Sequence, residues 1–328
     1  MTEGHPSPNV GRGRGWGATE DHPNTPHPAL RATLPTRGRG QWEPWARRVL
    51  LCLPLIFVAI FLVVPVGLTV MISFWERVGL RFRPAFSLAS YVSLVGGARL
   101  EVLRRSLLVA IEATALSLII AYVIAYFLAR KVTPAAARIV LVLFTIPFLI
   151  NYIVRNVSYT VLLGRTGVVN TALMAAGIID APLDWLLYSD FAVLLGLISA
   201  YMPFMIFPLF LSIGAIDRQY LEASALLGAS PLTTFRTITL PLSLPGVFAA
   251  GLFGLVGCLG ESAVPIILGG VGYELIGNTI TSSMDVLNYP LAAALSSVVI
   301  LLMLLLMLGW YLVFDMRSFL GRILEWRA

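Results

Sequence analysis

The sequence contains several apolar runs long enough to cross a lipid bilayer, and these restrict the chain to a membrane fold. A helix needs about 20 mainly apolar residues to span the hydrocarbon core. We predict six transmembrane helices at 49–74, 107–129, 137–154, 191–213, 246–268 and 293–315. The third run is short, and Pro147 and Asn151 indicate a bend in it. The predicted fold class is therefore all-α integral membrane, with the transmembrane domain covering residues 46–328.

One further stretch, residues 157–178, is apolar in places but is interrupted by polar residues and glycines. The interrupting residues are Gly164, Arg165, Gly167 and Asn170. Such a stretch is a poor transmembrane helix, and we interpret it as an interfacial or re-entrant helix.

Composition agrees with a chain that is solvated mostly by lipid. Only 12% of its residues are charged and 58% are hydrophobic, whereas soluble domains have about 25% charged residues. The net charge of +6 comes almost wholly from arginine, since Lys131 is the only lysine. These arginines flank apolar runs, which is typical of membrane topology, so no nucleic-acid partner is expected. Cys52 and Cys258 lie inside apolar runs, so we assign them no disulfide or metal role.

Residues 1–45 have a different composition, with GRGRGWG, PTRGRG and a Pro- and His-rich middle. They show no periodicity and cannot bury a core, so we predict a disordered tail. The apolar run that starts near Val49 is too long for a signal peptide. The GRGRG stretch could bind anionic lipid or RNA, but a solvated tail is the simpler interpretation.

The distribution of basic residues predicts an orientation. With both termini in the cytoplasm, 15 Lys and Arg residues lie inside and 8 lie outside. The positive-inside rule favours this arrangement. Six of the eight outside residues fall in segment 75–106, and they oppose the assignment.

The segment between the fourth and fifth predicted spans, 214–245, is polar enough to leave the membrane. Asp217 is a suitable N-cap for a helix over RQYLEASALL, and Gly228 suits the left-handed position that ends one. Leu221, Ala225 and Gly228 share a face of this helix at spacings of four and three.

A second short helix is predicted directly after it. Ser230 is a suitable cap, Pro231 suits the first helical position, and we expect Pro241 to end the helix. Its apolar side is formed by Leu232, Phe235 and Ile238. Two short helices with an apolar surface in water need a partner.

At these residues the chain resembles the EAA loop of ABC-importer permeases. That pattern reads EAA, three residues, G, nine residues, I, one residue, LP, and Glu222-Ala223, Gly228, Ile238 and Leu240-Pro241 match it without a gap. Ser224 replaces the second alanine. The resemblance implies the type I ABC-importer permease fold, in which this loop docks on a cytosolic ATPase. The implied coupling residues are Glu222, Ala223, Gly228, Ala229, Phe235, Ile238, Leu240 and Pro241.

Within that family the chain is most similar to the spermidine/putrescine permease branch. The supporting segments are AYFLAR (125–130), LLGRTGVVN (162–170), YMPFMIFPL (201–209), GE…P…LGG (260–270), IGNTI (276–280) and NYPLAAALS (288–296). Importers for iron, sulfate or phosphonates share some of them.

The resemblance also implies the partners. They are an ABC ATPase dimer, a second permease chain or another copy of this one, an extracytoplasmic solute-binding protein and the lipid of a bacterial inner membrane. Transport is expected by alternating access.

The chain is not expected to be an enzyme. A Walker A phosphate loop needs Gly-Lys-Ser/Thr, and the only lysine, Lys131, follows Arg130. ATP hydrolysis is therefore expected in a separate subunit, and this chain is expected to need no cofactor.

Ionisable residues inside spans are costly and indicate function. Glu261 stands among Gly257, Gly260 and Pro265, which should break the fifth helix and expose carbonyls. We consider two roles equally: a waypoint for a polycation, with Pro265 beside the path, or a structural carboxylate bonded to freed amides. The branch often has a second acid after the proline, where this chain has Ile266.

A second intramembrane acid, Glu112, lies seven residues beyond Arg105 on much the same helix face, and a structural pairing with that arginine is favoured. Asp190, Asp285 and Asp315 fall at span ends. A competing function is an ion-coupled secondary transporter that uses Glu112 and Glu261. Inverted repeats would support it, and the sequence shows none.

Overall fold

The structure, a computed structural model, describes residues 52–79 and 81–313. The predicted tail, residues 1–45, and Asp315 lie outside the described residues. The chain divides into two units, residues 1–60 and 61–328. Of the first unit the structure describes Cys52–Ile60, which are helical and exposed.

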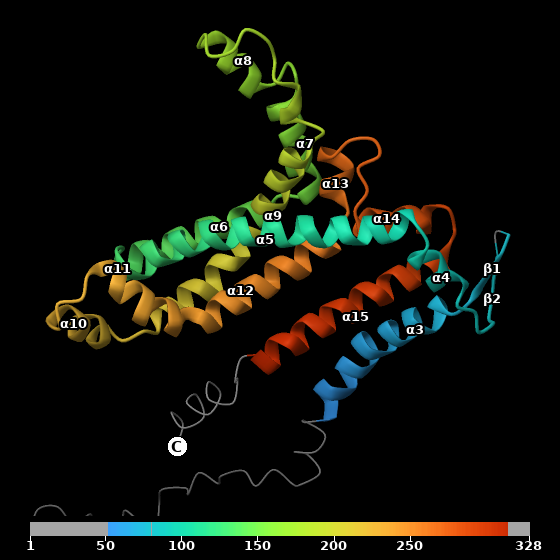
Figure 1. Cartoon of the computed structure of the whole chain (residues 1–328), viewed down its shortest axis with the longest axis horizontal. Coiled ribbons are helices and arrows are strands. Elements are labelled where there is room, and N and C mark those ends of the chain that lie inside the picture. The colour runs from blue at the N-terminus through green and yellow to red at the C-terminus, as the bar shows by residue number, and fades with distance from the viewer. Residues whose placement is uncertain (1–51, 80, 314–328) are drawn as a thin grey trace, which may run out of the picture. The chain divides into compact units, whose positions relative to one another are not determined.

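The remaining described residues are almost entirely helical (Figure 1). The elements are, in order, η1 (Ala59–Val63), α3 (Val64–Ser73), β1 (Glu76–Val78), β2 (Arg81–Arg83), α4 (Ala89–Val95), α5 (Ala98–Arg130), α6 (Pro134–Leu149), α7 (Tyr152–Leu163), α8 (Val168–Ala175), η2 (Asp184–Leu186), α9 (Asp190–Gly214), α10 (Arg218–Leu226), α11 (Pro231–Thr234), η3 (Phe235–Thr239), α12 (Leu240–Gly260), α13 (Ala263–Leu268), α14 (Ile276–Asp285) and α15 (Tyr289–Val313).

Five helical stretches in the described part of the chain are long and apolar enough to cross a membrane. They are Cys52–Ser73, Ala98–Arg130, Asp184–Gly214, Pro231–Gly260 and Tyr289–Gly309. The remaining expected span, the third, corresponds in part to the shorter helix α6. Expected span 137–154 is divided, because α6 ends at Leu149 and the Asn151 side chain accepts a hydrogen bond from the Ile153 amide to start α7.

Two other expected boundaries differ from the structure. Helix α5 begins at Ala98, nine residues before expected residue 107, because its first turns are amphipathic and lie outside the apolar run. Helix α12 ends at Gly260 and not at 268, because the backbone becomes extended at Glu261 before α13 starts. The break that Gly257, Gly260 and Pro265 predict near Glu261 is confirmed.

Small residues set the packing of the three central helices, α5, α9 and α12. Small buried residues recur at every fourth position on each of them: Ala113, Ser117, Ala121 and Ala125 on α5; Ala192, Gly196 and Ala200 on α9; Gly246, Ala250, Gly254 and Cys258 on α12. A spacing of four places them on one face of a helix, where the lack of bulk lets backbones approach closely. A side chain at Gly254 would press on Met205 of α9 and Thr114 of α5. The three helices therefore meet along small-residue faces.

Helices α10 and α11 lie at one end of this central group, and α4 and α14 lie at the opposite end (Figure 1). Helix α14 is tied to α5 there, since the Ile276 amide donates to the Ser106 hydroxyl at 2.7 Å. Helix α15 packs against both α3 and α14.

A two-stranded antiparallel sheet, β1 with β2, was not predicted. In its register Glu76 is opposite Arg83, Arg77 is opposite Phe82 and Val78 is opposite Arg81. The Arg77–Phe82 face makes two contacts: Arg77 donates to the Val286 carbonyl, and Phe82 lies edge-on to Tyr289 at the start of α15. The residues on both faces of the hairpin are exposed. The hairpin is therefore held by the segment between α14 and α15.

Segment 157–178 contains parts of two helices, α7 and α8, and not the single helix that was expected. A side chain at Gly167 would press on the carbonyls of Val161 and Leu162 at the end of α7 and on that of Gly164 in the turn. The buried Asn170 side chain accepts a hydrogen bond from the Leu183 amide and donates to the carbonyls of Gly164 and Leu183. These contacts interrupt the helix. An interfacial or re-entrant position stays a prediction.

Candidate functional site

The segment that resembles the EAA loop begins as expected. The Asp217 carboxylate accepts a hydrogen bond from the Gln219 amide at 3.0 Å, which caps the N-terminus of α10. The helix ends at Leu226, and Gly228 takes a positive φ of 78°. Left-handed backbone of this kind favours glycine, because other residues place Cβ too close to a carbonyl. The cap and the turn predicted at these two positions are confirmed.

The second helix of the segment starts as predicted but does not stop where predicted. The Ser230 hydroxyl accepts from the Thr233 amide, and Pro231 follows it at the first helical position. The helix then continues past Pro241 into α12, so the expected end there is wrong. The π-helical turn η3 ends at Thr239, two residues before Pro241, and its wider backbone makes room for the proline ring. The segment is therefore rigidly continuous with a transmembrane helix.

The exposed apolar surface of this segment is concentrated where the two helices meet. Leu226 and Leu227 are 89% and 88% exposed, and Leu232 is 58% exposed. Glu222 and Ala223 are also exposed on α10. The apolar face that the sequence predicts on α10 consists of Leu221, Ala225 and Gly228. Leu226 and Leu227 were missed, although they directly precede the turn glycine and a helix end leaves such residues uncovered.

The other residues implied by the resemblance do not all face outward. Pro241 is exposed, whereas Ala229, Phe235, Ile238 and Leu240 are half-buried. The segment thus has an outer side, which carries Glu222, Ala223 and Gly228, and an inner side that packs on the transmembrane helices.

Ser224, where the chain departs from the family pattern, joins the two short helices. It is 8% exposed, and its hydroxyl lies 2.8 Å from the Thr234 hydroxyl. An alanine at this position could not make the bond. Thr234 was not singled out from the sequence, because its partner lies ten residues away across the Gly228 turn.

Glu261 lies at the break between α12 and α13. One carboxylate oxygen, Oε1, accepts from the Ala263 amide at 2.9 Å and from the Val264 amide at 3.4 Å. The other, Oε2, accepts from the Tyr201 hydroxyl at 2.8 Å. This is the geometry of a structural carboxylate bonded to the freed amides of its own helix. A role in the path stays a prediction, and Pro265, the second residue of the expected path, is buried.

Tyr201 was missed as a partner of Glu261, although it begins the motif YMPFMIFPL. Its ring lies against Gly257, where any side chain would collide with it. Tyr201 also lines an apolar hollow of about 350 Å³ together with Phe204 and Phe253. A carboxylate and aromatic faces are thus neighbours on α9 and α12.

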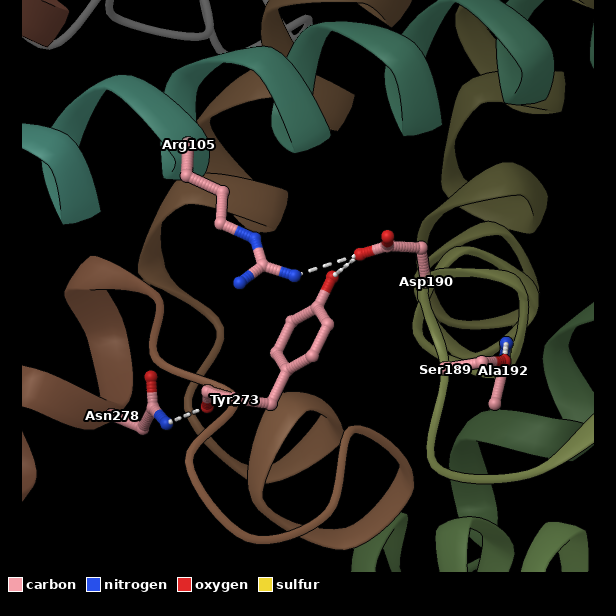
Figure 2. Close-up of polar contacts among 6 residues, drawn as sticks. All are labelled: Arg105, Ser189, Asp190, Ala192, Tyr273 and Asn278. Carbon is pink, nitrogen blue, oxygen red and sulfur yellow. Dashed lines mark hydrogen bonds and ion pairs between the residues drawn. The ribbon is translucent and has the colours of Figure 1, made fainter. Parts of the chain in front are cut away.

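A polar network joins three segments at the end of α5 that is remote from α10 (Figure 2). Arg105 of α5 donates to the Asp190 carboxylate of α9 at 3.0 Å, and the Tyr273 hydroxyl donates to the same oxygen at 2.6 Å. The Arg105 guanidinium carbon lies 4.3 Å from the centre of the Tyr273 ring. Burial, and then the hydrogen bond to Asp190, raise the pKa of Tyr273, so the hydroxyl keeps its proton as donor.

This network corrects the expected pairing of Arg105 with Glu112. Arg105 pairs with Asp190, Arg104 pairs with Glu101, and Glu112 is exposed on α5. Asp190 had been given no role beyond its place at a span end. Its partners lie 83 and 85 residues away, so no local pattern marks them.

Two cavities adjoin the loop that carries Tyr273. The larger, about 800 Å³, is lined by Tyr188, by the loop from Gly269 and by α14, and its charged residues are Glu274 and Asp285. The smaller, about 600 Å³, shares Glu274 but also includes Arg77 and Arg99. The larger of the two cavities therefore presents acidic side chains, and no basic side chain, to a bound cation.

Comparisons with known proteins agree with one another. The family model described as "Binding-protein-dependent transport system inner membrane component" matches residues 113–317. The chain is 34% identical over 245 residues to the spermidine/putrescine transport system permease protein PotB of Escherichia coli, covering 73% of this chain and 87% of that protein. It is 31% identical over 226 residues to the inner membrane ABC transporter permease protein YdcU of Escherichia coli, covering 66% and 72%.

The described fold also matches solved transporters. A bacterial ABC transporter for import of the acidic polysaccharide alginate has a chain that aligns with a TM-score of 0.59 at 17% identity, covering 80% of this chain and 93% of that one. The same type of transporter, in complex with alginate pentasaccharide-bound periplasmic protein, aligns with a TM-score of 0.61, covering 81% and 95%. At this identity the likeness concerns the fold.

Proposed function

The chain belongs to the family of binding-protein-dependent transport system inner membrane components, and on that premise we propose that it imports polyamines such as spermidine or putrescine. It is the membrane-spanning permease subunit of a binding-protein-dependent importer and a multi-pass protein of the inner membrane. The observation that carries the polyamine assignment is the extended similarity to spermidine/putrescine permeases, which covers most of both chains.

The chemistry around Glu261 supports a cationic solute. Its carboxylate lies beside Tyr201, whose ring forms part of an aromatic hollow with Phe204 and Phe253. Carboxylates and aromatic faces can replace water around an ammonium group. We propose that Glu261 faces the solute path in one state of the transport cycle.

The segment from α10 to η3 supports a dependence on a separate ATPase. Its exposed leucines, Leu226 and Leu227, form an apolar surface that needs a partner. In the proposed importer this surface docks on a cytosolic ATPase dimer, so both chain termini lie in the cytoplasm. A second permease chain and an extracytoplasmic solute-binding protein complete the assembly. Transport proceeds by alternating access, and ATP is used by the ATPase.

The experiment compares solute uptake in cells that lack this chain with uptake after its gene is restored. Labelled spermidine and putrescine are expected to enter only the restored cells. Uptake is expected to stop when ATP is depleted and to continue when a protonophore dissipates the ion gradient while ATP is maintained. Uptake of 2-aminoethylphosphonate or ferric iron in place of polyamines would replace the substrate assignment. Uptake that follows the ion gradient would replace the importer with a secondary transporter.

A further inference from the structure

Three residues near the end of α5 form a stripe along one face of that helix. They are Tyr122, Tyr126 and Arg130, and a spacing of four residues places them one above another. Two of them belong to the AYFLAR segment, to which the proposed function gives no role. All three contact the α10–η3 segment or the helices that it joins.

Arg130 holds the start of that segment. Its Nη2 donates to the Ile213 carbonyl at 2.8 Å and to the Ile216 carbonyl at 3.0 Å. These carbonyls lie at and just beyond the C-terminal end of α9. The last carbonyls of a helix receive no hydrogen bond from amides of that helix, and a positive charge beside them is favourable. Asp217, the cap of α10, is the next residue. The Arg130 guanidinium therefore fixes the point at which α9 ends and the α10–η3 segment begins.

The two tyrosines hold the other side of the segment. Phe235, the first residue of η3, meets Tyr122 with ring centres 5.8 Å apart and Tyr126 with ring centres 6.1 Å apart. The rings are nearly perpendicular, at 86° and 84°. Edge-to-face contacts of this kind are favourable and depend on orientation. Phe235 is thus fixed against two turns of α5.

A hydrogen bond extends this contact into α12. The Tyr122 hydroxyl lies 2.9 Å from the hydroxyl of Ser243, which is fully buried. Ser243 donates its own proton to the Leu240 carbonyl, so Tyr122 is the donor in the first bond. Tyr122 therefore contacts η3 before Pro241, through Phe235, and α12 after it, through Ser243.

We propose that the stripe Tyr122–Tyr126–Arg130 transmits movement of the α10–η3 segment to helix α5, in addition to the direct connection of that segment to α9 and α12 along the chain. The stripe holds the segment at its start, through Arg130, and at its end, through the tyrosines. A displacement of the segment must therefore displace α5. This inference rests on the proposed function, in which an ATPase moves the segment.

Helix α5 is suited to carry such a movement across the membrane. It is 33 residues long without a proline, and Arg105 lies about 37 Å from Arg130 along it. Arg105 is the residue that joins α5 to Asp190 and Tyr273 at the other end (Figure 2). A shift at the stripe is thus delivered to the network at the opposite end.

The test measures coupling, because a merely structural role would lower assembly without changing coupling. The complex of this chain with its ATPase, second permease and solute-binding protein is reconstituted in vesicles. Solute transported per ATP hydrolysed is measured, with spermidine or with whichever solute the unchanged complex transports. The variants are Tyr126→Leu with Arg130→Met, Tyr122→Phe and Arg130→Lys. Phe127→Leu is the control, since Phe127 is an exposed aromatic residue on the same turn.

The double variant is expected to hydrolyse ATP within twofold of the unchanged complex and to transport at least tenfold less solute per ATP. Tyr122→Phe, which loses one hydroxyl, is expected to lower the ratio about threefold. Arg130→Lys and Phe127→Leu are expected to stay within twofold. An unchanged ratio in every variant that assembles would overturn the proposal, and Tyr122→Phe keeps it testable where the double variant does not assemble. An unchanged complex without ATP-driven transport would instead refute the proposed function.

Discussion

Tyr201 and Glu261, which are 60 residues apart in the chain, are joined by a hydrogen bond of 2.8 Å from the phenol to the carboxylate. The same carboxylate caps α13 through the Ala263 amide. The charge is therefore held at the point where α12 is broken, beside exposed aromatic residues. The carboxylate thus stabilises the break, and under the proposed function the same side chain would also meet a cation.

Two substitutions at Glu261 separate these roles. Glu261→Gln keeps an acceptor for the Ala263 amide, so the yield of assembled complex is expected to stay within twofold while polyamine uptake falls at least tenfold. Glu261→Leu leaves the amides of α13 without an acceptor, at a cost of about 1–3 kcal/mol, and is expected to lower the yield. Uptake and yield are measured for both variants. Unchanged uptake by Glu261→Gln would leave Glu261 with a structural role alone.

Substitution of Gly228 is expected to disturb the angle between α10 and α11. Its φ of 78° is strained for a branched residue, and Gly228→Val should cost about 1–3 kcal/mol. The chain should still insert, while ATPase attachment or coupled uptake is lost. Gly228→Asn, which tolerates left-handed backbone, should restore much of the activity. Gly214→Val is the control, since Gly214 also has open space around it but no positive φ. Normal uptake by Gly228→Val would show that the turn does not matter.

Loss of the bond between Ser224 and Thr234 is expected to loosen the two short helices. A hydrogen bond of this type contributes about 0.5–1.5 kcal/mol, so amides of α10 should exchange with solvent several-fold faster in Ser224→Ala. Thr234→Val should have a similar effect, and the double variant should add little. Thr237→Val is the control, because the Thr237 hydroxyl bonds only within its own helix. Fully additive effects of the two changes would contradict a direct interaction.

Reversing the charge at Glu222 tests whether the exposed side of α10 docks on the ATPase. If the ATPase groove is basic or rich in amides, Glu222→Lys should weaken co-purification of the ATPase more at low salt than at high salt. Glu274→Lys is the matched control, since Glu274 is also exposed but belongs to the loop at the opposite end. Unchanged co-purification across a salt series would remove Glu222 from the interface.

The Arg105–Asp190–Tyr273 network is expected to stabilise the fold mainly through Tyr273 and less through Arg105. The Arg105–Asp190 ion pair is largely exposed, and such pairs contribute little. Tyr273 is only 8% exposed and donates to a charged acceptor, which favours a larger effect. Tyr273→Phe should therefore lower the melting temperature of the purified chain by a few degrees, and Arg105→Lys should lower it less. A larger loss for Arg105→Lys would reverse this ranking.

The presence and approximate location of the apolar helices, the caps at Asp217 and Ser230 and the turn at Gly228 were determined by the sequence alone, whereas several helix ends were not. Each depends on residues within a few positions of one another, because helix length, capping and left-handed backbone are local properties. The fixed spacing of residues from Glu222 to Pro241 likewise made the resemblance to the EAA loop of ABC-importer permeases recognisable from the sequence alone.

Only the tertiary structure decided which side chains meet. Arg105 was expected to pair with Glu112 of its own helix, and it pairs with Asp190 because the packing of α5 against α9 brings those two ends together. Phe235 packs against Tyr122, more than 100 residues earlier, and the helix continues past Pro241 because a π-helical turn precedes it. Such contacts depend on how separate helices pack, and a pattern along one chain does not contain that geometry.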